Sequence, residues 1–140
     1  MPTWILYALL SMAFAGLTSV IAKFGLSNAP SDVALTVRTS AVFGFVWLNA
    51  VVGGQLRLLG RLTRADLWVL VASGLTTTVS WIFYYRAIQT GQVSTVAVID
   101  KGSVVLTIAL AWLLLGEPLT PKLAAGAGLV VAGLLVLVWK

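Results

Sequence analysis

Residues 94–117 read STVAVIDKGSVVLTIALAWLLLGE, an apolar run of membrane length that has Asp100 and Lys101 well inside it. About twenty apolar residues are enough to cross the hydrocarbon of a bilayer, and ionisable side chains within such a span are costly. We therefore interpret this stretch as a transmembrane helix whose two charges are functional candidates. The rest of the chain is then the scaffold that shields this pair from lipid.

The composition of the whole chain also indicates a membrane protein. Of the 140 residues, 60% are hydrophobic, and the mean hydropathy is +1.04, whereas soluble domains are roughly half apolar. The net charge is +5, but the basic residues are scattered singly and form no basic face interleaved with aromatic rings. Nucleic-acid binding is therefore not expected.

The residue inventory removes most enzyme chemistry. The chain has no cysteine and no histidine, which excludes disulfides, thiolate or imidazole metal sites and a Ser–His–Asp triad. The four acidic residues are too dispersed to make a paired-carboxylate site; they are Asp32, Asp66, Asp100 and Glu117. We expect no catalytic residue, no metal, no cofactor and no enzyme activity.

Hydropathy predicts an all-α fold, a polytopic membrane helix bundle with five transmembrane helices. The predicted spans are Trp4–Ile21, Val33–Val52, Leu67–Ile88, Ser94–Glu117 and Leu123–Trp139. Residues 53–63 are predicted as a short amphipathic turn on the membrane surface. The predicted helix-end signals are Ser31 as an N-cap, a capping box from Thr63 to Asp66, a C-terminal Gly116, and Thr120 as an N-cap before Pro121.

Arg38 in the second span and a group of polar residues in the third span each allow two interpretations. Arg38 lies about 8 Å into its span, and it either reaches out to the lipid headgroups or faces the bundle interior. Ser73, Thr77, Trp81 and Tyr84 fall near one helical face. Their hydroxyls either bond carbonyls of their own helix or line a cavity.

Asp100 is predicted about 13 Å beyond Gly91 along the fourth span, toward the membrane core. Lys101 is adjacent in sequence, about 100° further around the helix, so we expect Asp100 to pair with Arg86 or Arg38 instead. Ser103 continues a polar stripe on the Asp100 face. The predicted substrate-binding residues are Arg38, Ser73, Thr77, Trp81, Tyr84, Arg86, Asp100, Lys101 and Thr107.

Two segments, AIQTGQVSTVAVIDKGSVV at 87–105 and LLLGEPLTPKLAAGAGLVVAGLLVL at 113–137, resemble the EamA domain of the drug/metabolite transporter superfamily. The resemblance is greatest to single-domain, five-helix bacterial and archaeal members, and it covers residues 1–140 as one domain. Ten-helix relatives fuse two such units in inverted orientation around a central site. The resemblance therefore implies that this chain is half of that architecture and must pair.

One departure from the superfamily restricts the mechanism. In the superfamily that this chain resembles, the four-helix multidrug exporters couple proton entry to a glutamate in the first helix. The position of this chain that corresponds to that glutamate is near Ala15. Proton-coupled cation export by that mechanism is therefore not expected. Asp100 is the only deep carboxylate that could take such a role.

The predicted function is secondary transport or export of a small polar metabolite by alternating access. Because Arg38, Arg86 and Lys101 outnumber Asp100 at similar depth, an anionic or zwitterionic substrate is favoured. The alternative is a non-transporting accessory subunit whose polar residues are structural.

The cell membrane is the predicted location, with the N-terminus in the cytoplasm. That orientation places Arg57, Arg61, Arg64 and Lys122 inside. The bias is small, so we expect a homodimer that can be antiparallel. Small side chains on the fifth span predict the dimer contact; they are Ala124, Gly128 and Ala132.

Overall fold

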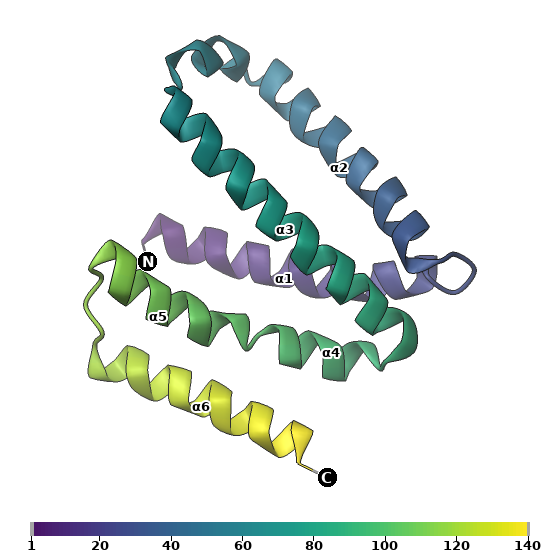
Figure 1. Ribbon diagram of the computed structural model, residues 1–140, viewed down its shortest axis with the longest axis vertical. Coiled ribbons are helices and arrows are strands. Elements are labelled where there is room, and N and C mark those ends of the chain that lie inside the picture. Colours follow the sequence, from purple (N-terminus) through teal and green to yellow (C-terminus); the bar gives the residue numbers. More distant parts are fainter. Residues whose placement is uncertain (1, 140) are drawn as a thin grey trace. The chain divides into compact units, whose positions relative to one another are not determined.

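The computed structural model describes residues 2–139, and every secondary-structure element in that range is a helix (Figure 1). The elements are α1 Thr3–Gly25, α2 Ser31–Val52, the 3₁₀ helix η1 Gln55–Arg61, α3 Arg64–Thr90, α4 Val93–Asp100, α5 Ser103–Leu115 and α6 Pro121–Val138. The chain divides into two compact units, Met1–Thr90 and Gly91–Lys140. Each unit is described by itself.

Within residues 2–139, four segments are long and apolar enough to cross a membrane. They are α1, α2, α3 and the run Val93–Leu115 that contains α4 and α5, while α6 is a shorter apolar helix. Large apolar side chains on these helices are exposed, for example Phe45 at 72% and Val52 at 79%. Lipid is the solvent that accommodates such a surface, so the chain is a multi-pass membrane protein.

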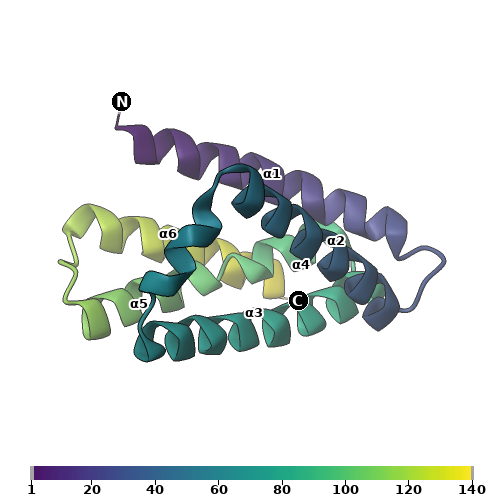
Figure 2. The same cartoon turned by 90° about the horizontal axis from the view of Figure 1, so that it is seen from above.

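The first unit contains α1, α2, η1 and α3. Helices α2 and α3 run side by side in opposite directions and are joined through η1 (Figures 1 and 2). The buried residues of this unit gather where α1 ends, α2 begins and α3 ends; they are Leu26, Ser31, Leu35, Tyr85 and Ile88. The helices of this unit are therefore fixed to one another mainly at that end.

Most predicted helix-end signals are confirmed. The Thr63 amide and hydroxyl donate hydrogen bonds to Asp66 Oδ2, and the Asp66 amide donates back to Thr63 Oγ1 at 3.2 Å, which is a capping box. Thr120 Oγ1 accepts from the Leu123 amide, with Pro121 as the first helical residue. Gly116 ends α5 at a φ of 68°, a conformation that glycine adopts without strain.

The prediction for Ser31 is wrong by one position. Helix α2 begins at Ser31, and the residue that precedes it is Pro30, whose φ of −58° suits a helix start. The Ser31 amide is satisfied from another helix, because it donates to Gln89 Oε1 at 3.3 Å. A side-chain cap is therefore replaced by a long-range contact, which local sequence could not reveal.

The second unit contains α4, α5 and α6, and α6 packs against both α4 and α5. The fourth predicted span, Ser94–Glu117, corresponds to the membrane-length run Val93–Leu115. It is not one continuous helix, because Lys101 and Gly102 interrupt it. The Gly102 amide donates to the Ile99 carbonyl at 2.9 Å, and the Val105 amide donates to the Gly102 carbonyl at 3.0 Å. These bonds span three residues rather than four, so the chain forms a tight turn between α4 and α5.

Candidate functional site

The nine residues predicted to bind substrate divide between the two units. Six lie on α2 and α3 of the first unit: Arg38, Ser73, Thr77, Trp81, Tyr84 and Arg86. Three lie on or between α4 and α5 of the second unit: Asp100, Lys101 and Thr107.

Arg38 of α2 stacks on an aromatic ring of α3. Its guanidinium carbon lies 4.2 Å from the centre of the Trp81 ring and 5.8 Å from that of the Tyr85 ring. Both distances are within the range of cation–π attraction. Arg38 is half-buried, and its Nη1 atom is fully buried with no hydrogen-bond partner among the described residues. The interior-facing interpretation of Arg38 is thus the one that agrees with its surroundings.

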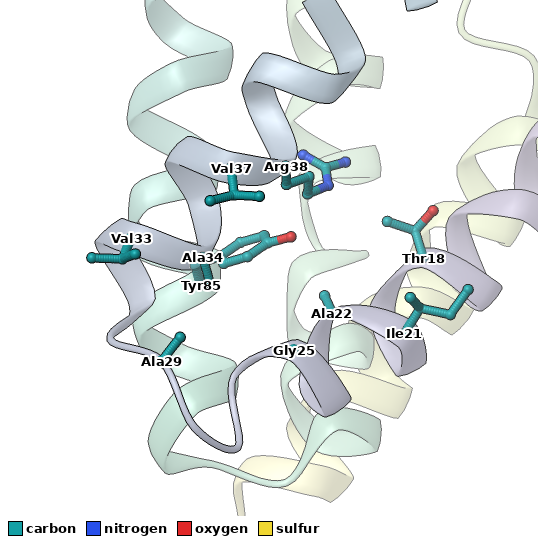
Figure 3. A pocket seen from close by; sticks show the side chains of 10 residues that line it. All are labelled: Thr18, Ile21, Ala22, Gly25, Ala29, Val33, Ala34, Val37, Arg38 and Tyr85. Carbon is teal, nitrogen blue, oxygen red and sulfur yellow. The ribbon is translucent and has the colours of Figure 1, made fainter.

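A cavity of about 410 Å³ lies beside Arg38, between α1, the loop after it, α2 and α3. Its lining residues are Thr18, Ile21, Ala22, Gly25, Ala29, Val33, Ala34, Val37, Arg38 and Tyr85. Figure 3 shows the Arg38 guanidinium and the Tyr85 hydroxyl directed from the α2 side toward the residues of α1. We name this space the Arg38 cavity.

A second cavity, of about 400 Å³, lies along the opposite face of α2. Its lining residues are Asp32, Leu35, Thr36, Thr39, Ser40, Thr78, Trp81, Ile82 and Arg86. Trp81 lines this cavity while its ring is stacked with Arg38. Trp81 therefore contacts Arg38 and also lines this second cavity. Thr77, which was predicted to bind substrate, is not among the lining residues, whereas its neighbour Thr78 is.

Arg86 has a carboxylate partner that the sequence analysis did not assign to it. Its Nη2 atom lies 3.1 Å from Asp32 Oδ2, and its Nε donates to Asp32 Oδ1 at 3.3 Å. This two-point contact joins α3 to the first turn of α2. A first-turn acid on a neighbouring helix therefore reaches Arg86, and the pairing of Asp100 with Arg86 or Arg38 stays a prediction.

The hydroxyls of the third span bond mainly within their own helix. The Thr76 and Thr77 hydroxyls both donate to the Ser73 carbonyl, at 2.8 and 2.9 Å. Ser73 and Thr77 are exposed on α3. Tyr84 differs, because its hydroxyl donates to Ser19 Oγ on α1 at 2.7 Å. For Thr77 the contact matches the structural interpretation, while Tyr84 ties two helices together.

Two residues that join the helices of the first unit, near the end of α1 and the end of α3, were not identified in the sequence analysis. Lys23 Nζ donates to the carbonyls of Ile88 and Gln89 at the end of α3, at 2.6 and 3.3 Å. The side chain of Gln89 also donates to the Ala29 carbonyl. A lysine at the end of an apolar span is the usual interfacial anchor, and a lone glutamine near a helix end gives no sequence signal, so neither contact could be inferred.

Asp100 and Lys101 lie at the break between α4 and α5. Lys101 Nζ is 4.0 Å from Asp100 Oδ2, the outer limit of an ion pair, and both side chains are partly exposed. Lys101 comes this close to the adjacent Asp100 because it lies beyond the end of α4, outside the regular helix. Thr107 donates its hydroxyl to the Ser103 carbonyl at 3.0 Å, so that hydroxyl is satisfied within α5.

Small residues of α6 face away from the helices that α6 packs against. Ala124, Gly128 and Ala132 are exposed, whereas Ala127 and Val130 are half-buried on the opposite side. A Cβ atom built on Gly128 would meet no atom within 4 Å. The predicted dimer residues are thus free for a further contact.

Among the described residues, no group of three or more acidic side chains could hold a metal ion.

Comparison with known proteins identifies a family and a curated relative. A family model described as the EamA-like transporter family matches residues 2–139. A curated relative from a Sinorhizobium species, named "Uncharacterized transporter in cobO 3′ region", is 36% identical over 135 residues, which is 96% of this chain and 96% of that protein. No solved structure matches the chain. The resemblance identified from residues 87–105 and 113–137 is confirmed.

Proposed function

Because this chain belongs to the EamA-like transporter family, we propose that it is a secondary transporter of a small polar metabolite. It moves an anionic or zwitterionic solute across the cell membrane by alternating access, and it works as a dimer. The family is one of transporters, so the proposal includes no catalytic step.

The break at Lys101 and Gly102 is the observation on which this proposal depends most. It lies about 12 Å beyond the start of the 23-residue run Val93–Leu115, well inside a hydrocarbon layer of about 30 Å. Irregular backbone at that depth is stable only where protein or a water-filled cavity surrounds it. In transporters such discontinuous helices supply the polar groups that contact solute and coupling ions.

The charges near the break and in the first unit favour an anionic group on the solute. Arg86 is neutralised by Asp32, so its charge is committed to the fold. Arg38 has no carboxylate among the residues that line its cavity, and Lys101 is only loosely paired with Asp100. Arg38 and Lys101 are therefore the cations that remain for a substrate.

Five membrane crossings complete the proposed topology. Helix α6 has 18 residues, about 27 Å at 1.5 Å per residue, which nearly spans the hydrocarbon. A cytoplasmic N-terminus places Arg57 and Arg61 of η1, together with Lys122, on the inner side. Since Lys23 is then on the outer side, the charge bias is small, and both orientations in one membrane would give an antiparallel dimer.

A flux experiment tests the proposal. Purified protein is reconstituted into proteoliposomes loaded with a pooled metabolite extract, and the external medium is analysed by mass spectrometry over time. We expect protein-dependent release of a subset of anionic or zwitterionic metabolites that saturates with concentration. Empty liposomes and a reconstituted unrelated five-span protein are the controls.

An absence of flux in either direction, from protein that remains folded and monodisperse, would contradict the proposal. It would favour the alternative of an accessory subunit, whose hydroxyls bond their own helices as those of Thr18, Thr36 and Thr77 do. Terminal reporter fusions test the topology separately. A single orientation of every copy would exclude the antiparallel dimer and leave transport itself untouched.

A further inference from the structure

The Arg38 guanidinium belongs to a cavity wall and has a nitrogen without a hydrogen-bond partner. A guanidinium group can stack through its flat faces and donates hydrogen bonds only in its plane. The guanidinium carbon of Arg38 lies over the Trp81 ring, 4.2 Å from its centre, so the ring covers one side of the group. The Nη1 atom is buried and has no hydrogen-bond partner among the described residues, and Arg38 is one of the residues that line the cavity. A buried cationic donor without an acceptor is costly, so a ligand that brings an acceptor to the guanidinium is favoured here.

The charges around the Arg38 cavity define that acceptor. No acidic residue is among the ten that line it. Asp32, the nearest acid in sequence, lies on the opposite face of α2, where it binds Arg86. An anionic group would therefore meet a cation and no repelling carboxylate. An ammonium group would meet Arg38 and have no counter-charge, which disfavours cations and weakens zwitterions.

The rest of the lining defines the body of the ligand. Most of the wall is aliphatic and small, with Ile21 and Ala22 on α1 facing Val33, Ala34 and Val37 on α2 (Figure 3). The polar exceptions beside Arg38 are Thr18 and Tyr85. A volume of about 410 Å³ falls at the small end of the range for small-molecule sites, about 300–1,000 Å³. The cavity suits a compact apolar group attached to one charged end.

We propose that the Arg38 cavity binds a small organic monoanion, with its carboxylate in the plane of the Arg38 guanidinium and its apolar body against α1 and α2. The proposal narrows the solute of the proposed transport function from anionic or zwitterionic to monoanionic. Trp81 acts as a positioning residue, because its ring holds the guanidinium edge toward the cavity.

Binding in the absence of flux provides the test. Calorimetric titrations use the purified full chain in a neutral detergent, so that no anionic lipid competes. The probes are benzoate, 3-methylbutanoate, and the matched neutral and cationic compounds benzamide and benzylamine. At least one carboxylate should bind, about tenfold or more tightly than benzamide, because a charged hydrogen bond distinguishes the two. Benzylamine should not bind measurably.

Variants locate the site. Arg38→Gln should weaken carboxylate binding about tenfold or more, and Arg38→Lys should weaken it less, because the charge remains without the planar fork. Arg57→Gln, in exposed η1, is the matched control and should leave binding unchanged. Ala34→Phe, which fills the cavity beside an intact Arg38, should also abolish binding. Thermal unfolding establishes that each variant is folded.

Several results would overturn the proposal. These are failure of the wild-type protein to bind either carboxylate, equal binding of benzamide and benzoate, and unchanged carboxylate binding by folded Arg38→Gln. The comparison of wild-type probes needs no variant, so a misfolded variant does not prevent a decision. Metabolite flux that continues in Arg38→Gln would contradict this site and leave transport standing. Carboxylate binding without any flux would contradict transport and leave the site standing.

Discussion

Lys23 of α1 lies with its Nζ atom 2.6 Å from the carbonyl oxygen of Ile88, close to the end of α3. The last carbonyls of a helix lack intrahelical partners and carry partial negative charge, so a lysine from another helix satisfies them well. Ile88 is fully buried, which shields the contact. This hydrogen bond is one of the connections between α1 and α3 in the first unit.

We expect Lys23→Gln to lower the free energy of unfolding by about 1.5–3 kcal/mol, the usual value of a hydrogen bond to a charged group. The mechanism is loss of the donor to the Ile88 and Gln89 carbonyls. Unfolding in detergent is followed by circular dichroism. Lys122→Gln, in the first turn of α6, is the control and should have a small effect. Equal effects of the two substitutions would contradict the role of Lys23.

The Asp32–Arg86 ion pair predicts a small coupling energy. Its side chains are 57% exposed at Arg86 and 64% at Asp32, and exposed pairs contribute about 0–1 kcal/mol. A double-mutant cycle of Asp32→Asn and Arg86→Gln should therefore give a coupling below about 1 kcal/mol. Arg86→Gln combined with Asp100→Asn should be additive. Strong coupling in the second cycle would restore the pairing first predicted from the sequence.

Features set by local chemistry or by long apolar runs could be predicted from the sequence. The Thr63–Asp66 capping box and the Gly116 and Thr120 signals depend on neighbouring residues, and they are confirmed. The long apolar runs also correctly predicted four segments of membrane length. The fifth span and the pairing of copies stay predictions.

Features that depend on which helices meet could not be predicted. Asp32 reaches Arg86 across 54 positions, and Lys23 reaches Ile88 across 65; no periodicity encodes either contact. The break after Asp100 was missed because the apolar residues on both sides of it extend the run to membrane length. The available signal was Gly102 next to the charged pair Asp100 and Lys101. The pair that suggested a function therefore also lies where the helix is interrupted.

Gly102 provides a test of the packing at the break. A Cβ atom on Gly102 would lie 3.0 Å from Leu134 Cδ1 on α6 and 3.0 Å from the Ile99 carbonyl oxygen, both tighter than ordinary contact. Gly102→Val should therefore destabilise the protein by about 1–3 kcal/mol through overpacking. Gly133→Val is the control, because a Cβ there meets no atom within 4 Å. If the two variants unfold at the same temperature, α6 does not pack closely against the break.

The exposed small residues of α6 predict where copies of the chain meet. Gly128→Leu should weaken the proposed dimer, since a large side chain separates two backbones that would otherwise approach closely. Gly133→Leu, about 140° around the helix from Gly128, should leave the dimer intact. Crosslinking and gel filtration in detergent measure both. An unchanged dimer with Gly128→Leu would exclude this face from the interface.

Variants of Asp100 can distinguish a structural role of this residue from a role in transport. Its side chain is 41% exposed, and its Oδ2 atom lies 4.0 Å from Lys101 Nζ, the outer limit of an ion pair, so this contact contributes little to stability. A merely structural Asp100 predicts that Asp100→Asn is mildly destabilised and that adding Lys101→Gln restores both stability and flux. A carboxylate at a helix break inside the membrane has little reason to persist for so small a contribution.

We therefore expect Asp100→Asn to stay folded and to lose metabolite flux in proteoliposomes, and the double variant Asp100→Asn with Lys101→Gln to stay inactive. Asparagine keeps the size of the side chain and removes its charge, so a loss of flux without a loss of stability assigns the effect to the charge. Glu117→Gln, in the loop after α5, is the control and should transport normally. Undiminished flux in folded Asp100→Asn would return Asp100 to the scaffold, because the break would then need its backbone and not its carboxylate.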